Sequence, residues 1–300
     1  MRLLTRSDFD GIACAALLKE LGVIDSMEYA HPKDLQDGKI EVTENDILAN
    51  VPYVPGCGLW FDHHSSEKER LDLEGQYQGS SCEAPSAARV VYDYYNDPRL
   101  DKFDEMLMYV DRVDSAQLTE EEILNPSGWV LLGFLCDPRT GLGYHKSFTI
   151  SNLQLMKNLM EALRSQSIDE IMADPNIKER VQMYFENDAR SKEFLQKNTR
   201  IDGCVAITDA RGLTDMPPGN RFLIYMFPQT NVSVRMIDGR GKKFVAISVG
   251  YSILNRTATV DVGSLMLKYG GGGHKAVGTC QVPYADADRV LAEMIEVIKG

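Results

Sequence analysis

Short apolar segments alternate with a helical pattern over the first 65 residues of this 300-residue chain, and this alternation constrains its fold most. Arg2–Thr5 has the composition of a buried strand, and Gly11–Leu21 has apolar residues at helical spacing. Two further strands are expected at Ile47–Asn50 and Leu59–Phe61. A strand, a helix and two strands in this order predict a parallel α/β sheet.

The pattern changes twice further along the chain. Residues 84–200 are mostly helical in pattern, and strands return after residue 200. The strands expected there are Gly203–Thr208, Phe222–Phe227, Asn231–Ile237, Lys243–Val249 and Ala276–Val282. We therefore expect an α/β protein with a parallel-sheet domain over residues 1–176 and a helical connector over 177–199. A smaller mixed-sheet domain over 200–300 would complete it, with a cleft between the two domains.

The net charge of −12 lies in the first 200 residues, because residues 201–300 carry 11 Lys and Arg against 9 Asp and Glu. Long duplex nucleic acid needs a basic surface, so it is not expected as a partner. The longest uncharged run, Ile47–Phe61, has 15 residues, whereas a membrane-spanning helix needs about 20. Six cysteines without CxxC spacing argue against a zinc ribbon or a disulfide scaffold and predict a cytoplasmic protein.

Two carboxylates follow the first expected strand. In an extended segment Asp8 and Asp10 point the same way, and Gly11 permits a sharp turn into the helix. Ligands of open α/β sheets bind beyond the carboxyl ends of the strands, and carboxylate pairs suit Mg²⁺ and Mn²⁺. Taken alone, the same residues also fit a turn with an aspartate helix cap.

Asp62, His63 and His64 directly follow another expected strand. One histidine can bind a metal ion while the other serves as a general acid, and an exposed loop pair is the alternative. Asp111 and Asp114 lie in a helical segment, where ordinary surface acids are also common. None of these residues identifies a site by itself.

Four consecutive glycines, Gly270–Gly273, follow a helical segment near the end of the chain and precede His274 and Lys275. Such a run lets backbone N–H groups approach an anion closely. A flexible linker is the alternative, but apolar periodic segments flank the run on both sides. An anion-binding segment is therefore expected here.

Together these motifs resemble the DHH phosphoesterase superfamily with its DHH-associated C-terminal domain. The motifs are SDFDG near the start, DHH at residues 62–64, an aspartate at residue 111 and GGGGHK near the end. The exopolyphosphatase-related proteins and the nanoRNases look most similar. The resemblance covers nearly the whole chain and implies hydrolysis of a small phosphorylated substrate by metal-activated water. Such a substrate would be a short single-stranded oligonucleotide, a 3′-phosphorylated nucleotide or polyphosphate.

The resemblance also implies a role for each matching residue. The residues that match ligands of Mn²⁺ or Mg²⁺ are Asp8, Asp10, His63 and Asp111. His64 matches the histidine that faces the scissile phosphate or its leaving group, and Asp62 orients the histidine pair. The residues that match the substrate-binding part are Arg235, Gly271, Gly272, Gly273 and His274.

Two positions depart from the family pattern. Many members have a histidine shortly before the first aspartate pair, where this chain has Thr5 and Arg6. Asn50 stands where an aspartate bridging two metals is expected, and an amide is a poorer bridge than a carboxylate. We therefore expect one tightly held metal ion and a second that is weak. Two alternatives remain: a nucleotide- or metal-binding module with weakened catalysis, and an inorganic pyrophosphatase.

Overall fold

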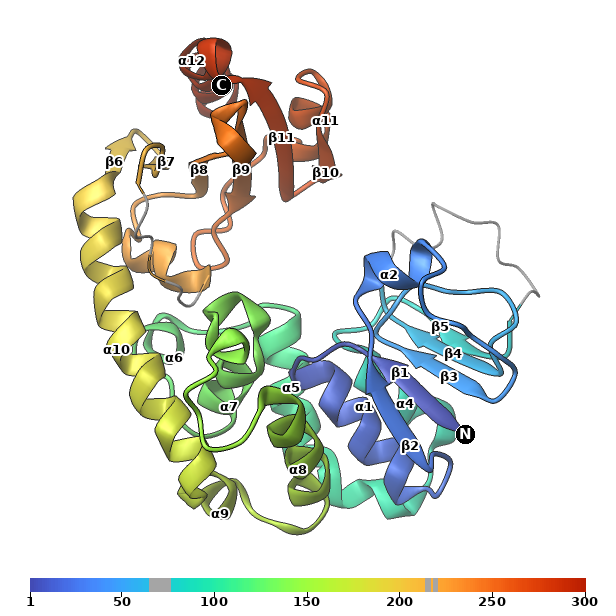
Figure 1. Cartoon of the computed structure of the whole chain (residues 1–300). Helices are drawn as coiled ribbons and strands as arrows, with labels where there is room; N and C mark the ends of the chain where they lie inside the picture. The colour runs from blue at the N-terminus through green and yellow to red at the C-terminus, as the bar shows by residue number, and fades with distance from the viewer. Residues whose placement is uncertain (65–76, 214–216, 218–220) are drawn as a thin grey trace. The chain divides into compact units, whose positions relative to one another are not determined.

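The computed structural model describes residues 1–64, 77–213, 217 and 221–300, without the side chains of Arg221, Leu223, Arg240 and His274. The chain divides into two compact units, whose elements are labelled in Figure 1. The first unit comprises Met1–Gln117 and Pro126–Tyr184, and the second comprises Leu118–Asn125 and Phe185–Gly300.

The first unit contains a sheet of five parallel strands in the order β2-β1-β3-β4-β5. Its strands are β1 (Arg2–Thr5), β2 (Ser26–Tyr29), β3 (Asp46–Ala49), β4 (Leu59–Asp62) and β5 (Gly79–Ser81). The residues of β3 are all buried, as expected for a strand covered on both faces. All carboxyl ends of a parallel sheet lie at one edge, so the segments after β1, β3 and β4 lie together there.

The first unit also contains the α-helices α1 (Phe9–Glu20), α2 (Pro32–Gln36), α4 (Ala87–Tyr95), α5 (Asp104–Asp114), α7 (Gly128–Cys136), α8 (Asn152–Ser165) and α9 (Ile168–Ala173). Of these, α1 and α4 contact the strands of this sheet. Helix α1 is almost wholly buried and packs against α4, α5 and α8. Its start requires Gly11, because a Cβ there would lie 2.1 Å from the carbonyl oxygen of Arg6. The glycine therefore lets α1 begin directly after β1.

The second unit contains a six-stranded sheet in the order β10-β11-β9-β8-β7-β6. Its strands are β6 (Thr199–Asp202), β7 (Val205–Asp209), β8 (Val232–Asp238), β9 (Phe244–Tyr251), β10 (Gly272–His274) and β11 (Val277–Pro283). Only the β7–β8 pair is parallel among the pairs described, so the sheet is mixed. A parallel sheet in one unit and a mixed sheet in the other confirm the predicted fold class.

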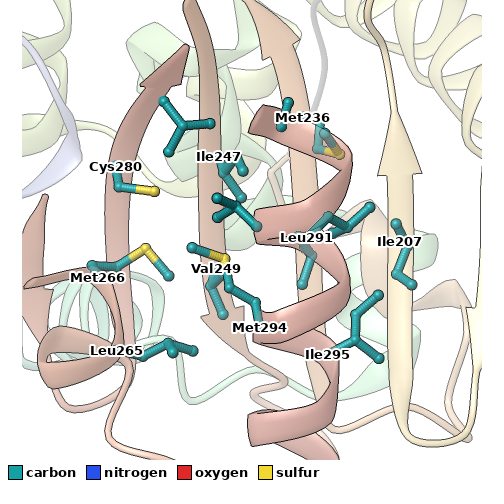
Figure 2. Close-up of a cluster of buried hydrophobic side chains, with 14 of the residues drawn as sticks. Ile207, Met236, Ile247, Val249, Leu265, Met266, Cys280, Leu291, Met294 and Ile295 are labelled. Atoms are coloured by element: carbon teal, nitrogen blue, oxygen red, sulfur yellow. The ribbon is translucent and has the colours of Figure 1, made fainter. Parts of the chain in front are cut away.

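One face of the mixed sheet carries the core of the second unit (Figure 2). On β8, Val234 and Met236 are buried against α11 (Val262–Leu267) and α12 (Ala287–Lys299). Ser233 and Arg235 alternate with these residues along β8 and therefore point to the opposite face. This alternation leaves a face of polar side chains for other contacts.

Among the described residues, the remaining α-helices are α6 (Glu120–Leu124) in the second unit and α10 (Pro175–Asn198). The chain passes from the first unit to the second within α10, between Tyr184 and Phe185. The expected strand at Phe222–Phe227 is wrong, because Arg221–Met226 forms a 3₁₀ helix. There the Tyr225 hydroxyl donates a hydrogen bond to the carbonyl of Tyr251, at the end of β9. No helix among the described residues is long and apolar enough to cross a membrane.

Candidate metal centre

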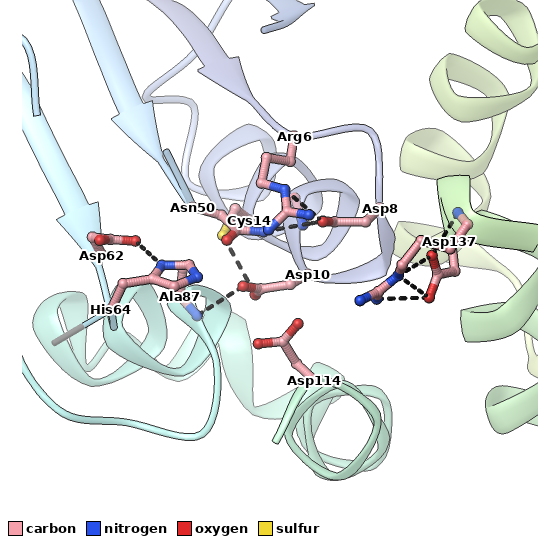
Figure 3. A network of polar contacts seen from close by, with 12 residues as sticks. Arg6, Asp8, Asp10, Cys14, Asn50, Asp62, His64, Ala87, Asp114 and Asp137 are labelled. Atoms are coloured by element: carbon pink, nitrogen blue, oxygen red, sulfur yellow. Dashed lines mark hydrogen bonds and ion pairs between the residues drawn. The ribbon is translucent and has the colours of Figure 1, made fainter. Parts of the chain in front are cut away.

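Asp8 and Asp10 follow β1, but the protein binds them in different ways. Asp8 caps α1, where its Oδ1 accepts hydrogen bonds from the Gly11 N–H and the Asn50 side-chain amide, both at 3.0 Å. Its Oδ2 lies 3.1 Å from Nε of Arg6. Figure 3 shows Arg6, Asn50 and Asp8 together at this point. Asp8 is therefore held by three donors of the chain itself.

Asp10 is fully buried in the first turn of α1. Its carboxylate accepts hydrogen bonds from the N–H groups of Ala87 (2.9 Å) and Ala88 (2.8 Å), the first two residues of α4. The Cys14 thiol, one helical turn further on, donates to Oδ1 of Asp10 at 3.9 Å. The start of one helix thus fixes a carboxylate on another, and a helix N-terminus favours negative charge.

Asp10, His63 and Asp114 form a compact group, with one potential ligand atom of each lying within 4.8 Å of the others. Nε2 of His63 is 3.2 Å from Oδ2 of Asp114 and 3.8 Å from Oδ2 of Asp10. On the other side of the ring, Nδ1 lies 3.1 Å from the carbonyl oxygen of Ala84. That carbonyl requires a proton on Nδ1, so Nε2 presents its lone pair to the two carboxylates.

These residues fit a divalent metal ion. Nε2 of His63 is buried and makes no hydrogen bond to any residue that the structure describes. Burial, together with the charges of Asp114 and Asp8, raises the pKa of Asp10 well above its usual range. Burial and the charge of Asp8 also raise the pKa of Asp114, while the charge of Arg6 acts in the opposite direction. A bound cation would relieve the repulsion between these carboxylates and occupy the orphaned nitrogen.

The resemblance to the DHH superfamily implied that Asp111 is a metal ligand, but Asp111 lies outside this group. Its Oδ1 accepts a hydrogen bond from the Ser86 hydroxyl at 2.6 Å, and its Oδ2 accepts two from Arg89 at 3.0 and 2.8 Å. Asp114, three residues later on α5, points at Asp10 (Figure 3), and its Oδ2 lies 3.2 Å from Nε2 of His63. Asp114 therefore belongs to the candidate metal group in this structure, and a ligand role for Asp111 stays a prediction.

Asp62 and His64 form a pair next to Asp10, His63 and Asp114, the three residues called the metal group from here on. Nδ1 of His64 lies 2.8 Å from Oδ1 of the buried Asp62. This hydrogen bond raises the pKa of His64, which favours a protonated ring. A pocket of about 180 Å³ opens at His64 and is also lined by Arg6, Gln36 and Asn50. His64 is thus placed to donate a proton to a ligand held there.

Asn50 follows β3, and its backbone lies in the left-handed region with φ of 56°. Asparagine tolerates this conformation better than most residues. Its side-chain amide donates to Asp8, and its Oδ1 is buried without a hydrogen bond to the described residues. Asn50 therefore supports Asp8 through its side-chain N–H.

The predicted substrate-binding residues lie in the second unit. Arg235 lines a pocket of about 300 Å³ on the face of the sheet opposite the core, together with the hydroxyl-bearing Thr208, Ser233 and Ser248. Helix α10 supplies Phe194 and Leu195 to the same pocket. A permanent cation and several hydroxyls beside apolar side chains can bind a phosphorylated nucleoside.

The glycine run forms a strand instead of a loop, because Gly272–His274 is β10 and pairs with β11. Gly271 and Gly273 are needed for that pairing, since a Cβ on either would lie 2.2–2.3 Å from a carbonyl oxygen of β11. A Cβ at Gly272 would meet nothing within 4 Å. The side chain of His274 lies outside the described part of the structure. Gly272 is therefore the glycine whose role the fold does not explain.

The sequence motifs do not single out Arg6, and they leave the role of Asp114 open. Asp10 and Cys14 are four residues apart in a predicted helix, so the sequence could have indicated that they are in contact. The bonds from Ala87 and Ala88 to Asp10 are made by backbone N–H groups, so no residue type could reveal them. These contacts depend on where α4 begins.

A solved structure is similar to this chain over almost its whole length. No family model matches it, and none of the curated proteins does. Among solved structures it is similar to the pGpG-specific phosphodiesterase PggH from Vibrio cholerae, with 43% identity and a TM-score of 0.87. That match covers 99% of this chain and 98% of PggH.

A more distant likeness is to RecJ from Thermus thermophilus in complex with Mn²⁺. It has 11% identity over 97% of this chain and 50% of that chain, with a TM-score of 0.47. At this identity and TM-score the likeness carries no conclusion about the present protein.

Proposed function

The chain belongs to the DHH phosphoesterase superfamily, and from this premise we propose that it hydrolyses the internal phosphodiester bond of a short 5′-phosphorylated dinucleotide. As a member, it is a metal-dependent phosphoesterase that acts on a small phosphorylated substrate. The observation that carries the proposal is the group formed by Asp10, His63 and Asp114 at the carboxyl edge of the parallel sheet. The relative that shares 43% of its sequence is specific for pGpG, which is such a dinucleotide.

We propose Mn²⁺ or Mg²⁺ as the metal, with one ion tightly held by Asp10, His63 and Asp114. Two carboxylate oxygens and one imidazole nitrogen are ligands that suit these ions. When bound, such an ion neutralises charge on the phosphoryl group and lowers the pKa of water. The N–H groups of Ala87 and Ala88 would keep the Asp10 carboxylate in place and ionised.

In the reaction, the oxygen of a water molecule forms a bond to phosphorus and the bond between phosphorus and the 3′ oxygen breaks. The leaving oxygen needs a proton, which we assign to the imidazolium of His64. Asp62 holds that ring through Nδ1, which leaves Nε2–H as the donor. A raised pKa keeps His64 protonated closer to neutral pH, as a general acid requires. The water proton passes to solvent, so the products are two nucleoside 5′-phosphates.

The second unit would hold the nucleotide. Arg235 and the hydroxyls of Ser233 and Ser248 line its pocket and would contact phosphate and ribose. Gly272 would let the edge strand β10 approach the anion. This division of roles predicts that variants in the second unit raise KM and leave metal content unchanged.

The test is a substrate panel with the purified full chain and Mn²⁺. The panel contains pGpG, unphosphorylated GpG, 3′-phosphoadenosine 5′-phosphate, polyphosphate and pyrophosphate, and products are separated by anion-exchange chromatography. We expect GMP from pGpG at the highest kcat/KM, loss of this activity in His63→Ala, and normal activity in His145→Ala. His145 is an exposed histidine outside the metal group. Cleavage of pyrophosphate or polyphosphate with pGpG left intact would contradict the proposal, as would binding of pGpG without turnover.

A further inference from the structure

Arg6 forms an ion pair with a carboxylate that the sequence had suggested as a metal ligand. Its Nε lies 3.1 Å from Oδ2 of Asp8, while Oδ1 of Asp8 accepts hydrogen bonds from Gly11 and Asn50. A metal ion at Asp8 would compete with these donors for the same lone pairs, and it would meet the positive charge of the guanidinium. Asn50 adds no negative charge to offset that repulsion.

The Arg6 side chain is one-third exposed and lines the pocket of about 180 Å³ at His64. Gln36 and Asn50 supply amide groups to the same pocket, and Asp62 supplies a carboxylate that already binds His64. None of the three residues of the metal group lines it. The pocket therefore lies beside the metal group and carries its own permanent positive charge.

A guanidinium carries five N–H donors in a planar fork, a shape that matches two oxygens of a phosphate. Nε is the donor that faces Asp8, so this ion pair fixes the plane of the fork. An arginine held in this way stabilises a phosphate without reorganisation, as a second metal ion would in a two-metal site.

We propose that Arg6 replaces a second metal ion in this protein and that it binds a phosphate group of the substrate in the pocket at His64. The inference rests on the proposed function for the identity of the substrate, but its two tests use only inorganic phosphate and Mn²⁺. A failure to hydrolyse pGpG would therefore leave both tests intact.

The first test is calorimetric titration of the EDTA-treated full chain with inorganic phosphate. Arg6→Gln should weaken phosphate binding at least tenfold, and Arg6→Lys should recover part of it by restoring the charge. Arg99→Gln is the matched control, because Arg99 also pairs with an aspartate two residues away, Asp97, in an exposed part of the same unit. Unchanged phosphate binding in Arg6→Gln, or equal losses in both glutamine variants, would overturn the proposal.

The second test counts bound Mn²⁺ by elemental analysis after dialysis, with circular dichroism to confirm folding. The unaltered chain and Asn50→Asp should each retain one equivalent, because Arg6 still occupies Asp8. Arg6→His combined with Asn50→Asp removes the guanidinium and adds two metal ligands, so it should retain close to two equivalents. Two equivalents in the unaltered chain, or one in the folded double variant, would show that Arg6 does not replace a second ion.

Discussion

The hydroxyl of Ser86 donates a hydrogen bond of 2.6 Å to the carboxylate of Asp111, and this contact connects α5 to the start of α4. Ser86 also caps α4 by accepting from the Arg89 N–H. The next two N–H groups of α4 bind Asp10, the central carboxylate of the metal group. In the metal site that we propose, Asp111 would therefore support Asp10 through the start of α4, and Asp114 on the same helix would be a ligand itself.

This distinction predicts different effects for two similar substitutions. Asp114→Asn removes a charged ligand and should weaken Mn²⁺ binding by roughly a hundredfold or more. Asp111→Asn removes a support and should weaken it by on the order of tenfold. Titration of both variants with Mn²⁺ measures the difference. A larger loss in Asp111→Asn than in Asp114→Asn would restore the assignment suggested by sequence.

The role of His64 predicts a dependence on the leaving group. His64→Asn should lower kcat for pGpG by about 10²–10⁴-fold, the usual contribution of a general acid. A nucleoside 5′-(p-nitrophenyl phosphate) releases a stable nitrophenolate, which needs no proton, so its hydrolysis should fall much less. Parallel kinetics with the two substrates measure this. Equal losses on both would mean that His64 binds the phosphate group without donating a proton.

The glycine run predicts opposite outcomes at neighbouring positions. Gly271→Ala places a Cβ 2.3 Å from the Thr279 carbonyl oxygen and should destabilise the second unit by about 1–3 kcal/mol. Gly272→Ala meets nothing within 4 Å, so its stability should stay within about 0.5 kcal/mol of the original while KM rises. Thermal unfolding and steady-state kinetics check both. An unchanged KM in Gly272→Ala would assign the whole run to strand pairing.

A pH-dependent contribution to stability should come from Asp46, at the start of β3. Burial acts to raise the pKa of Asp46, but hydrogen bonds from Arg2 (2.7 and 3.0 Å) and Thr43 outweigh it and lower the pKa overall. A lowered folded-state pKa means that the stabilisation is complete above the unfolded pKa, near 3.9. It is then lost as the pH falls through the folded value.

Asp46→Asn should therefore reduce the free energy of unfolding at pH 7 by about 1–3 kcal/mol, and the difference should shrink below about pH 4. Urea unfolding at several pH values measures it. Asp25→Asn, which breaks an exposed pair with the N-terminal amine, is the control and should change little. A constant difference between pH 7 and pH 3 would contradict the ionic origin of the effect.

Much of the fold follows from apolar patterns in the sequence. The buried strands β1, β3 and β4 have continuous apolar residues, so they were recognisable. Phe222–Phe227 has the same composition but forms a 3₁₀ helix, because composition alone does not show whether a neighbouring strand is available for pairing. The polar β2 (Ser26–Tyr29) was missed for the opposite reason, since it lies at the sheet edge with mostly solvent-accessible side chains.

The candidate site was predictable in its residue types and less so in its membership. Asp10 lies in the first turn of the helix that follows β1, and His63 directly follows β4. The carboxyl ends of these strands lie at one edge of the sheet, so the convergence of the two residues follows from the sheet. Asp111 and Asp114 are three residues apart on one helix and nearly share a face, so spacing could not separate them. Their roles differ because Arg89 and Ser86 lie opposite one of them and His63 lies opposite the other.

The account depends most on which side chains hold the metal, and a crystal of the full chain grown with Mn²⁺ measures this directly. An anomalous difference map at the manganese edge should show one strong peak per chain, at bonding distance from Asp10, His63 and Asp114. The side chain of Arg6 should remain paired with Asp8 in the same crystal. A peak bound to Asp8 or Asp111, or a second peak of comparable height beside Asp8, would contradict the account.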